Sequence, residues 1–317
     1  MKKTVLKALI RKITPHKLRF LIRIIRKGLF GKHIAEIKQF KNDRKYAASD
    51  FPLYLSFVAI AKNETPYIAE WIEYHLLVGV QKFFIYDNES ADNLREYLES
   101  YIKDGIVEYN YFPGNRQQIA AYNDAINRYK YSSFWLAFID IDEFLVPVNN
   151  RSIPDFLRNF EDVPGIEVDQ VKYGSSGHEK KTNALVIERF KNHSSLNIFP
   201  RLEEKSIVNP RYVLYMTVHI AEYFNGEYSV DTHKHKKTEK YVNRPALYDK
   251  LRYNHYACKS LEEFVSRTDR GRAASPGKLS IDDFYERDYN EEKNDTIMDK
   301  YIQKIKEKLK LRFGSNI

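Results

Sequence analysis

Short apolar runs alternate with amphipathic segments along the chain from residue 53 onward. The apolar runs are rich in β-branched and aromatic residues, and they predict strands at 53–61, 82–86, 106–112 and 134–139. The segments between them have a helical period and predict helices at 65–78, 91–103 and 115–130. Strands joined by helices of this length pair in parallel through right-handed crossovers. We therefore expect an α/β fold in which helices flank a mostly parallel sheet.

Polar residues gather directly after three of the predicted strands. They are Asn63 and Glu64, Asp87 and Asn88, and Asp140, Asp142 and Glu143. In open α/β sheets the ligand binds outside the carboxyl ends of the strands, so we expect a nucleotide-type site at this edge. A glycine-rich dinucleotide fingerprint does not follow the first strand, and no P-loop motif occurs. Phosphate charge must therefore be met by a metal ion and by Lys or Arg.

Asp140 and Asp142 flank one residue at the end of the apolar run FWLAFI. In an extended chain, residues i and i+2 point to the same side, so both carboxylates can face one ion. Two neighbouring carboxylates repel each other, and a divalent cation relieves that repulsion. Oxygen ligands favour Mn²⁺ or Mg²⁺ over zinc. We expect a metal at this pair, and the alternative is an acidic turn without one.

The first 45 residues form a basic arm. They hold 15 of the 52 Lys and Arg residues and only two of the 43 acidic residues, so acidic residues slightly outnumber basic ones in the rest of the chain. Residues 17–30 predict an amphipathic helix with Leu and Ile residues on one face, too short and too charged to span a bilayer. We expect the arm to lie on an anionic membrane surface, as a cytoplasmic peripheral element at the inner face of the cell membrane.

Two alternatives for the arm are docking on protein and binding of nucleic acid. The acidic balance of the body argues against a nucleic-acid partner. The lone cysteine, Cys258, excludes an internal disulfide framework and fits a reducing compartment. We expect three units: the arm at 1–45, a globular domain at 53–285, and a charged C-terminal helix within 286–317.

Several long stretches resemble glycosyltransferase family 92 and, more broadly, the family-2-like GT-A transferases. They are AKNETPYIAEWIEYHLLVGVQKFFIYDNES at 61–90, RQQIAAYNDAI at 116–126, FWLAFIDIDEFLVP at 134–147, VKYGSSGH at 171–178 and NHYACKSLEEF at 254–264. The arm and the C-terminal helix lie outside this resemblance. The resemblance implies a GT-A fold for residues 53–285. It also implies transfer of a sugar, most often galactose, from a UDP-sugar with inversion at the anomeric carbon.

The resemblance also implies roles for individual residues. Those that would border the nucleotide-sugar are Ala61, Asn63, Glu64, Asp87, Gln118 and Asn123. His255 would be a third metal ligand beside Asp140 and Asp142. Lys259 would neutralise the diphosphate, assisted by Arg270 or Arg272.

An inverting transfer needs a carboxylate that accepts the proton of the attacking hydroxyl. Glu188 is the first choice for this base, with Glu222 and Asp231 as alternatives. We expect a metal-dependent glycosyltransferase that acts on a glycan or lipid-linked glycan in envelope or capsular polysaccharide synthesis. The alternatives are a metal-dependent phosphoryl hydrolase and a non-catalytic, membrane-associated binding or scaffold protein.

Overall fold

The computed structural model describes residues 46–149, 151–196, 203–224, 227–237, 245–268 and 280–314, together with Ile22, Ile25 and Gly28. Ile22 and Ile25 are helical and exposed. The remainder of the arm prediction, and Arg270, lie outside the described residues. In the part of the chain that the structure describes, no helix is long and apolar enough to cross a bilayer.

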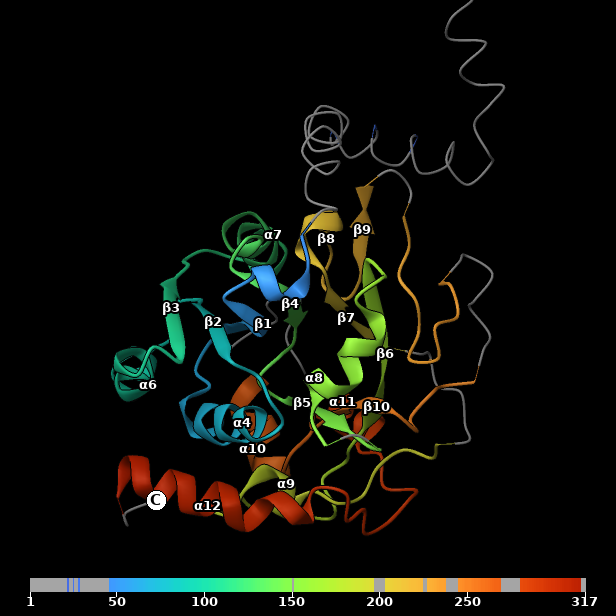
Figure 1. Cartoon of the computed structure of the whole chain (residues 1–317). Coiled ribbons are helices and arrows are strands. Elements are labelled where there is room, and N and C mark those ends of the chain that lie inside the picture. The colour runs from blue at the N-terminus through green and yellow to red at the C-terminus, as the bar shows by residue number, and fades with distance from the viewer. Residues whose placement is uncertain are drawn as a thin grey trace, which may run out of the picture.

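An eight-stranded mixed sheet forms the centre of the protein, with the order β3-β2-β1-β4-β7-β6-β10-β5 (Figure 1). One half is parallel and consists of β1 (Leu53–Ala61), β2 (Lys82–Asp87), β3 (Val107–Tyr111) and β4 (Ser133–Phe138). The other half consists of β5 (Glu143–Pro147), β6 (Gly165–Lys172), β7 (Glu204–Val208) and β10 (Leu251–His255). Here β6 and β10 are parallel, whereas β7 and β5 run antiparallel to their neighbours.

Helices and a small hairpin cover the sheet. The helices of four or more residues in the described part are α4 (Thr65–Leu77), α5 (Leu94–Tyr97), α6 (Glu99–Lys103), α7 (Gln118–Tyr129), α8 (Ile153–Leu157), α9 (Val186–Arg189), α10 (Leu261–Thr268), α11 (Ile281–Arg287) and α12 (Asp299–Phe313). The hairpin consists of β8 (Val213–Met216) and β9 (Ala221–Tyr223). The expected α/β fold is confirmed.

Alternate side chains of β1 build the two apolar layers. Phe57 and Ala59 point into the larger core, which α4 and α12 share. Val58 and Ile60 point into the second core, under α7 and β8. Because both faces of the sheet are covered at β1, the sequence of this strand is continuously apolar, which is typical of a central parallel strand.

The predicted elements up to β4 agree with the structure to within a few residues. The helix expected at 91–103 is divided into α5 and α6 at Leu98. The short strands β5 and β7 were not predicted, and they make the sheet mixed. The C-terminal helix packs against α4, where the rings of Tyr301 and Tyr74 lie 5.0 Å apart and Arg312 donates to Glu73 at 3.1 Å.

All eight strands of the central sheet have one end at the same edge. The carboxyl ends of the parallel strands lie there, and the antiparallel strands β7 and β5 begin there. The described body begins beside the opposite edge, where Phe51 packs on Phe134 at 5.8 Å between ring centroids. The polar strand-end residues therefore lie at the edge away from this entry point.

Candidate active site

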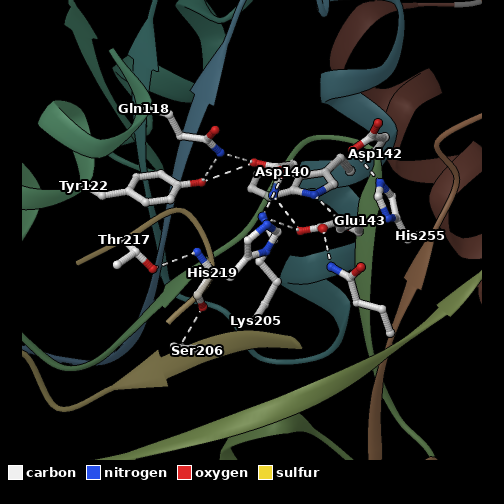
Figure 2. A network of polar contacts seen from close by, with 12 residues as sticks. Gln118, Tyr122, Asp140, Asp142, Glu143, Lys205, Ser206, Thr217, His219 and His255 are labelled. Carbon is white, nitrogen blue, oxygen red and sulfur yellow. Dashed lines mark hydrogen bonds and ion pairs between the residues drawn. The ribbon is translucent and has the colours of Figure 1, made fainter. Parts of the chain in front are cut away.

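Asp140 lies in a turn after β4, and its carboxylate points into the protein. The backbone N–H of Glu143 donates to the carbonyl of Asp140 at 3.0 Å and closes the turn. Asp140 Oδ1 accepts from Gln118 Nε2 at 2.9 Å and from the hydroxyl of Tyr122 at 3.2 Å. Lys205 Nζ lies 2.7 Å from Asp140 Oδ2 (Figure 2). Asp140 thus belongs to a network of protein donors.

Lys205 is a buried cation that the sequence analysis missed. Its amine lies 3.4 Å from Glu143 Oε2, in addition to its contact with Asp140. Burial alone would disfavour the charged amine, but the two carboxylates outweigh it and raise the pKa of Lys205 well above its ordinary value. Glu143 is fully buried, and burial raises the pKa of its carboxyl, while the charge of Lys205 opposes that shift. It also accepts from Gln170 Nε2 at 2.5 Å.

Asp142 points to the other side of the turn, toward His255 and Arg267 (Figure 2 shows the pair with His255). His255 Nε2 lies 3.6 Å from Asp142 Oδ1, and Arg267 Nη2 lies 3.1 Å from Asp142 Oδ2. Register explains the approach of His255, because β10 and β5 place it directly opposite Glu143. Burial lowers the pKa of His255, which keeps the imidazole neutral and able to act as a ligand.

The expectation that Asp140 and Asp142 face one ion is not supported by this geometry. The i and i+2 rule holds for extended backbone, whereas residues 140–143 form a turn. Within the described residues, no three His, Cys, Asp or Glu side chains converge to hold an ion by themselves. Asp142 and His255 nevertheless offer one oxygen and one nitrogen donor. Such a pair fits a Mn²⁺ or Mg²⁺ ion whose remaining ligands come from a diphosphate and water.

Lys259 and Arg267 place two buried donors beside Asp142. Lys259 is 1% exposed, and its Nζ has no hydrogen-bond partner among the described residues. Arg267 donates through Nη1 to the carbonyl of Ala257 at 2.8 Å, but its Nε is likewise unpartnered. Burial and the charge of Arg267 lower the pKa of Lys259 to about 8, while Asp142 and Glu64 oppose that shift. Two buried nitrogen atoms of cationic side chains, Lys259 Nζ and Arg267 Nε, thus lack an acceptor among the described residues, and such atoms form a site for an anion.

The other predicted nucleotide-binding residues lie at the same edge, but several already have protein partners. Asn63 has a φ of 55° and accepts from the N–H of Ala91 at 2.7 Å. Asp87 accepts from the N–H of Ser90 at 2.9 Å and from the hydroxyl of Tyr109 at 2.5 Å. These contacts shape the loops after β1 and β2, where Ala61 accepts from the N–H of Asn88 at 2.8 Å.

Glu64, Gln118 and Asn123 differ in how near they lie to the acidic turn. Glu64 is buried at the start of α4, and its charge acts on Lys259 and Arg267. Gln118 touches Asp140 directly. Asn123 instead joins α7 to β8, accepting from the N–H of Met216 at 2.9 Å and donating to its carbonyl at 2.8 Å. A structural role accounts for Asn123.

Glu188 lies on α9 and forms an ion pair with Lys306 of α12 at 2.7 Å. No contact between Glu188 and the acidic turn is found among the described residues, so its role as base stays a prediction. Glu203, which precedes β7, lies closer to the site. Its carboxylate is 3.3 Å from Lys172 Nζ and is 40% exposed. Lys172, His255 and His219 overcome the effect of burial and lower the pKa of Glu203, so this carboxylate is ionised.

Four residues of the site were missed by the sequence analysis: Lys205, Arg267, Glu203 and His219. Three of them lie on or near β7 and the β8–β9 hairpin, whose elements were not predicted. The carbonyl of His219 accepts from Ser206 Oγ of β7 at 3.1 Å, which ties the hairpin turn to the site. Arg267 could have been found, because it lies three positions before Arg270 in the sequence that follows Lys259.

Relatives of known family resemble most of this chain. A glycosyltransferase family 92 protein of Oryza sativa subsp. japonica is 29% identical over 68% of this chain and 35% of its own length. Galactan beta-1,4-galactosyltransferase GALS2 of Arabidopsis thaliana is 25% identical over 50% of this chain and 34% of its own length. The chain thus spans about a third of the length of these relatives.

Among solved structures, that of S. aureus TarS 1–349 has a TM-score of 0.40 and 13% identity, covering 65% of this chain and 61% of that one. The model of the family described as glycosyltransferase family 92 matches residues 58–313 of this chain. This match includes α12, so the expectation that the C-terminal helix lies outside the resemblance is wrong. Over four-fifths of its length, from within β1 to the end of α12, the chain belongs to glycosyltransferase family 92.

Proposed function

We propose that this protein is a metal-dependent, inverting glycosyltransferase. It takes a sugar, galactose or a related hexose, from a UDP-sugar and adds it to a hydroxyl of a glycan or lipid-linked glycan. The observation that carries the proposal is the pair of unpartnered buried donors, Lys259 Nζ and Arg267 Nε, next to Asp142 and His255. A diphosphate supplies the anion that these donors lack. Membership of the family supports the reaction class, and the galactan galactosyltransferase relative supports the sugar.

The residues divide the work of the reaction between them. Asp142 and His255 would hold a Mn²⁺ or Mg²⁺ ion, which when bound supplies Lewis-acid stabilisation of the leaving diphosphate. Lys259 and Arg267 donate hydrogen bonds to the diphosphate oxygens as negative charge develops there. The bond between the anomeric carbon and the diphosphate oxygen breaks while the acceptor oxygen bonds to the opposite face.

A carboxylate accepts the proton that the acceptor hydroxyl loses. We propose Glu203 for this role in preference to Glu188, because Glu203 is ionised and close to His255 and His219. Both carboxylates have a lysine partner, Lys172 for Glu203 and Lys306 for Glu188, but no contact between Glu188 and the acidic turn is found among the described residues. A general base of this kind contributes about 10²- to 10⁴-fold to the rate.

The setting of the reaction is part of the same proposal. We place the enzyme at the inner face of the cell membrane, where the acceptors belong to envelope or capsular polysaccharide synthesis. The basic composition of the arm supports this location. The phosphoryl hydrolase alternative is less favoured, because the described site supplies two metal ligands and two phosphate-binding cations without a third protein ligand. A non-catalytic scaffold would have no need of buried cationic nitrogen atoms that lack an acceptor.

A panel of UDP-sugars, measured with and without Mn²⁺, tests the proposal. We expect hydrolysis or transfer with UDP-galactose or a closely related donor, and thermal stabilisation by UDP that increases with Mn²⁺. Lys259→Met should abolish the stabilisation by UDP. Lys191→Met is the matched control, since Lys191 is paired with Asp299 on α12. An absence of response to every UDP-sugar under every metal condition would contradict the proposal.

A further inference from the structure

Lys259 is held in an unusual position for a buried lysine. Its φ of 55° lies in the left-handed region, which costs a residue with a Cβ about 1 kcal/mol. Its ammonium lies 4.4 Å from the centroid of the Tyr67 ring. Tyr67 belongs to α4, on the helix that follows the first polar strand end. The face of an aromatic ring attracts a cation without cancelling its charge.

Glu263 fixes the loop on which Lys259 stands. Its Oε2 accepts from the N–H of Ser260 at 3.1 Å and from Ser260 Oγ at 2.5 Å. Its Oε1 accepts from the hydroxyl of Tyr67 at 3.0 Å. Ser260 is the residue directly after Lys259, so one carboxylate ties together the loop that carries the lysine and the ring beneath its ammonium.

Arg189 keeps Glu263 from pairing with Lys259. Its two terminal nitrogens lie 2.7 and 2.9 Å from the two Glu263 oxygens, and the side chains are 4% and 1% exposed. Despite burial, the hydrogen bonds from Arg189 and Ser260 lower the pKa of Glu263 to about 2, so this carboxylate is ionised and already occupied. The Lys259 ammonium is therefore left with the Tyr67 ring on one side and no acceptor on the other.

We propose that Tyr67 is a positioning residue for donor binding: its ring holds the Lys259 ammonium and its hydroxyl locks the loop through Glu263. This inference rests on the proposed function, in which Lys259 binds the diphosphate. The ring replaces the carboxylate that a buried lysine ordinarily pairs with. An incoming diphosphate therefore meets a cation that is already desolvated and placed, and it has no protein anion to displace.

A double-mutant cycle on UDP binding tests the proposal, with UDP and Mn²⁺ as the probe. Tyr67→Leu should weaken UDP binding about 10- to 30-fold in the wild-type background. The same change should have almost no effect when Lys259→Met is already present, because the ring then has no ammonium to hold. Tyr67→Phe keeps the ring and should lose less affinity than Tyr67→Leu.

The control is Tyr54→Leu, a tyrosine that stacks on Phe134 and donates to Glu161 away from the site. It should bind UDP as the wild type does. If the effects of Tyr67→Leu and Lys259→Met simply add, the positioning role is overturned while Lys259 remains the anchor. If Lys259→Met itself binds UDP as the wild type does, the proposed role of Lys259 in diphosphate binding is wrong, and with it the basis of the proposed function.

Discussion

The two aspartates of the D-x-D segment have different partners, although one residue separates them. Asp140 is bound by Gln118, Tyr122 and Lys205, whereas Asp142 faces His255 and Arg267. The sequence alone predicts that both residues matter, because their position after an apolar strand is informative. It does not predict their directions, since the turn at 140–143 depends on a backbone hydrogen bond and on a lysine 65 residues away.

Asparagine variants should separate the two roles. Asp142→Asn should lower kcat/KM by about 100-fold or more and remove the effect of Mn²⁺ on UDP binding, because a metal ligand is lost. Asp140→Asn should instead destabilise the fold by about 2 kcal/mol, since charge-assisted hydrogen bonds from its partners weaken. Thermal unfolding and a Mn²⁺ titration of UDP binding measure the two effects. Equal Mn²⁺ dependence in Asp142→Asn and the wild type would refute its role as a ligand.

At the scale of the elements, the parallel half of the sheet could be predicted and the other half could not. Strand β1 lies between two cores and has a continuous apolar run, so its pattern is strong. Strand β7 has only the five residues EKSIV, and its Lys205 is buried through ion pairs with the acidic turn. A charged residue in a core position hides the strand from a hydrophobic pattern.

Because β7 was not predicted, neither was Glu203, which directly precedes this strand and which we propose as the base. Glu203→Gln should lower kcat by about 100-fold or more with little change in UDP affinity, because it removes a proton acceptor beside the site. Glu188→Gln should keep kcat within a few-fold, since its ion pair with Lys306 on α12 is a partly exposed contact. Initial rates with a saturating donor compare the two variants. If only Glu188→Gln is inactive, the original prediction from the sequence is right.

At the scale of the whole molecule, the charge of the chain is divided between the basic arm and a slightly acidic body. Deletion of residues 1–45 should abolish binding to vesicles that contain anionic lipid, because each basic residue near such a surface contributes about 1 kcal/mol. Activity on a soluble acceptor should remain. Co-sedimentation with anionic and neutral vesicles measures the first effect. Unchanged sedimentation of the deletion variant would show that the arm has another purpose.

The entry of the chain beside one end of β1, with the reacting groups beyond the other, has a geometric consequence. Nine strand residues at about 3.3 Å each separate Leu53 from Ala61 by roughly 25 Å. A ligand bound at the carboxyl end of β1 therefore lies about one strand length from the residues at which the described body begins. A change in the segment before Leu53 can reach the reacting groups only across that distance.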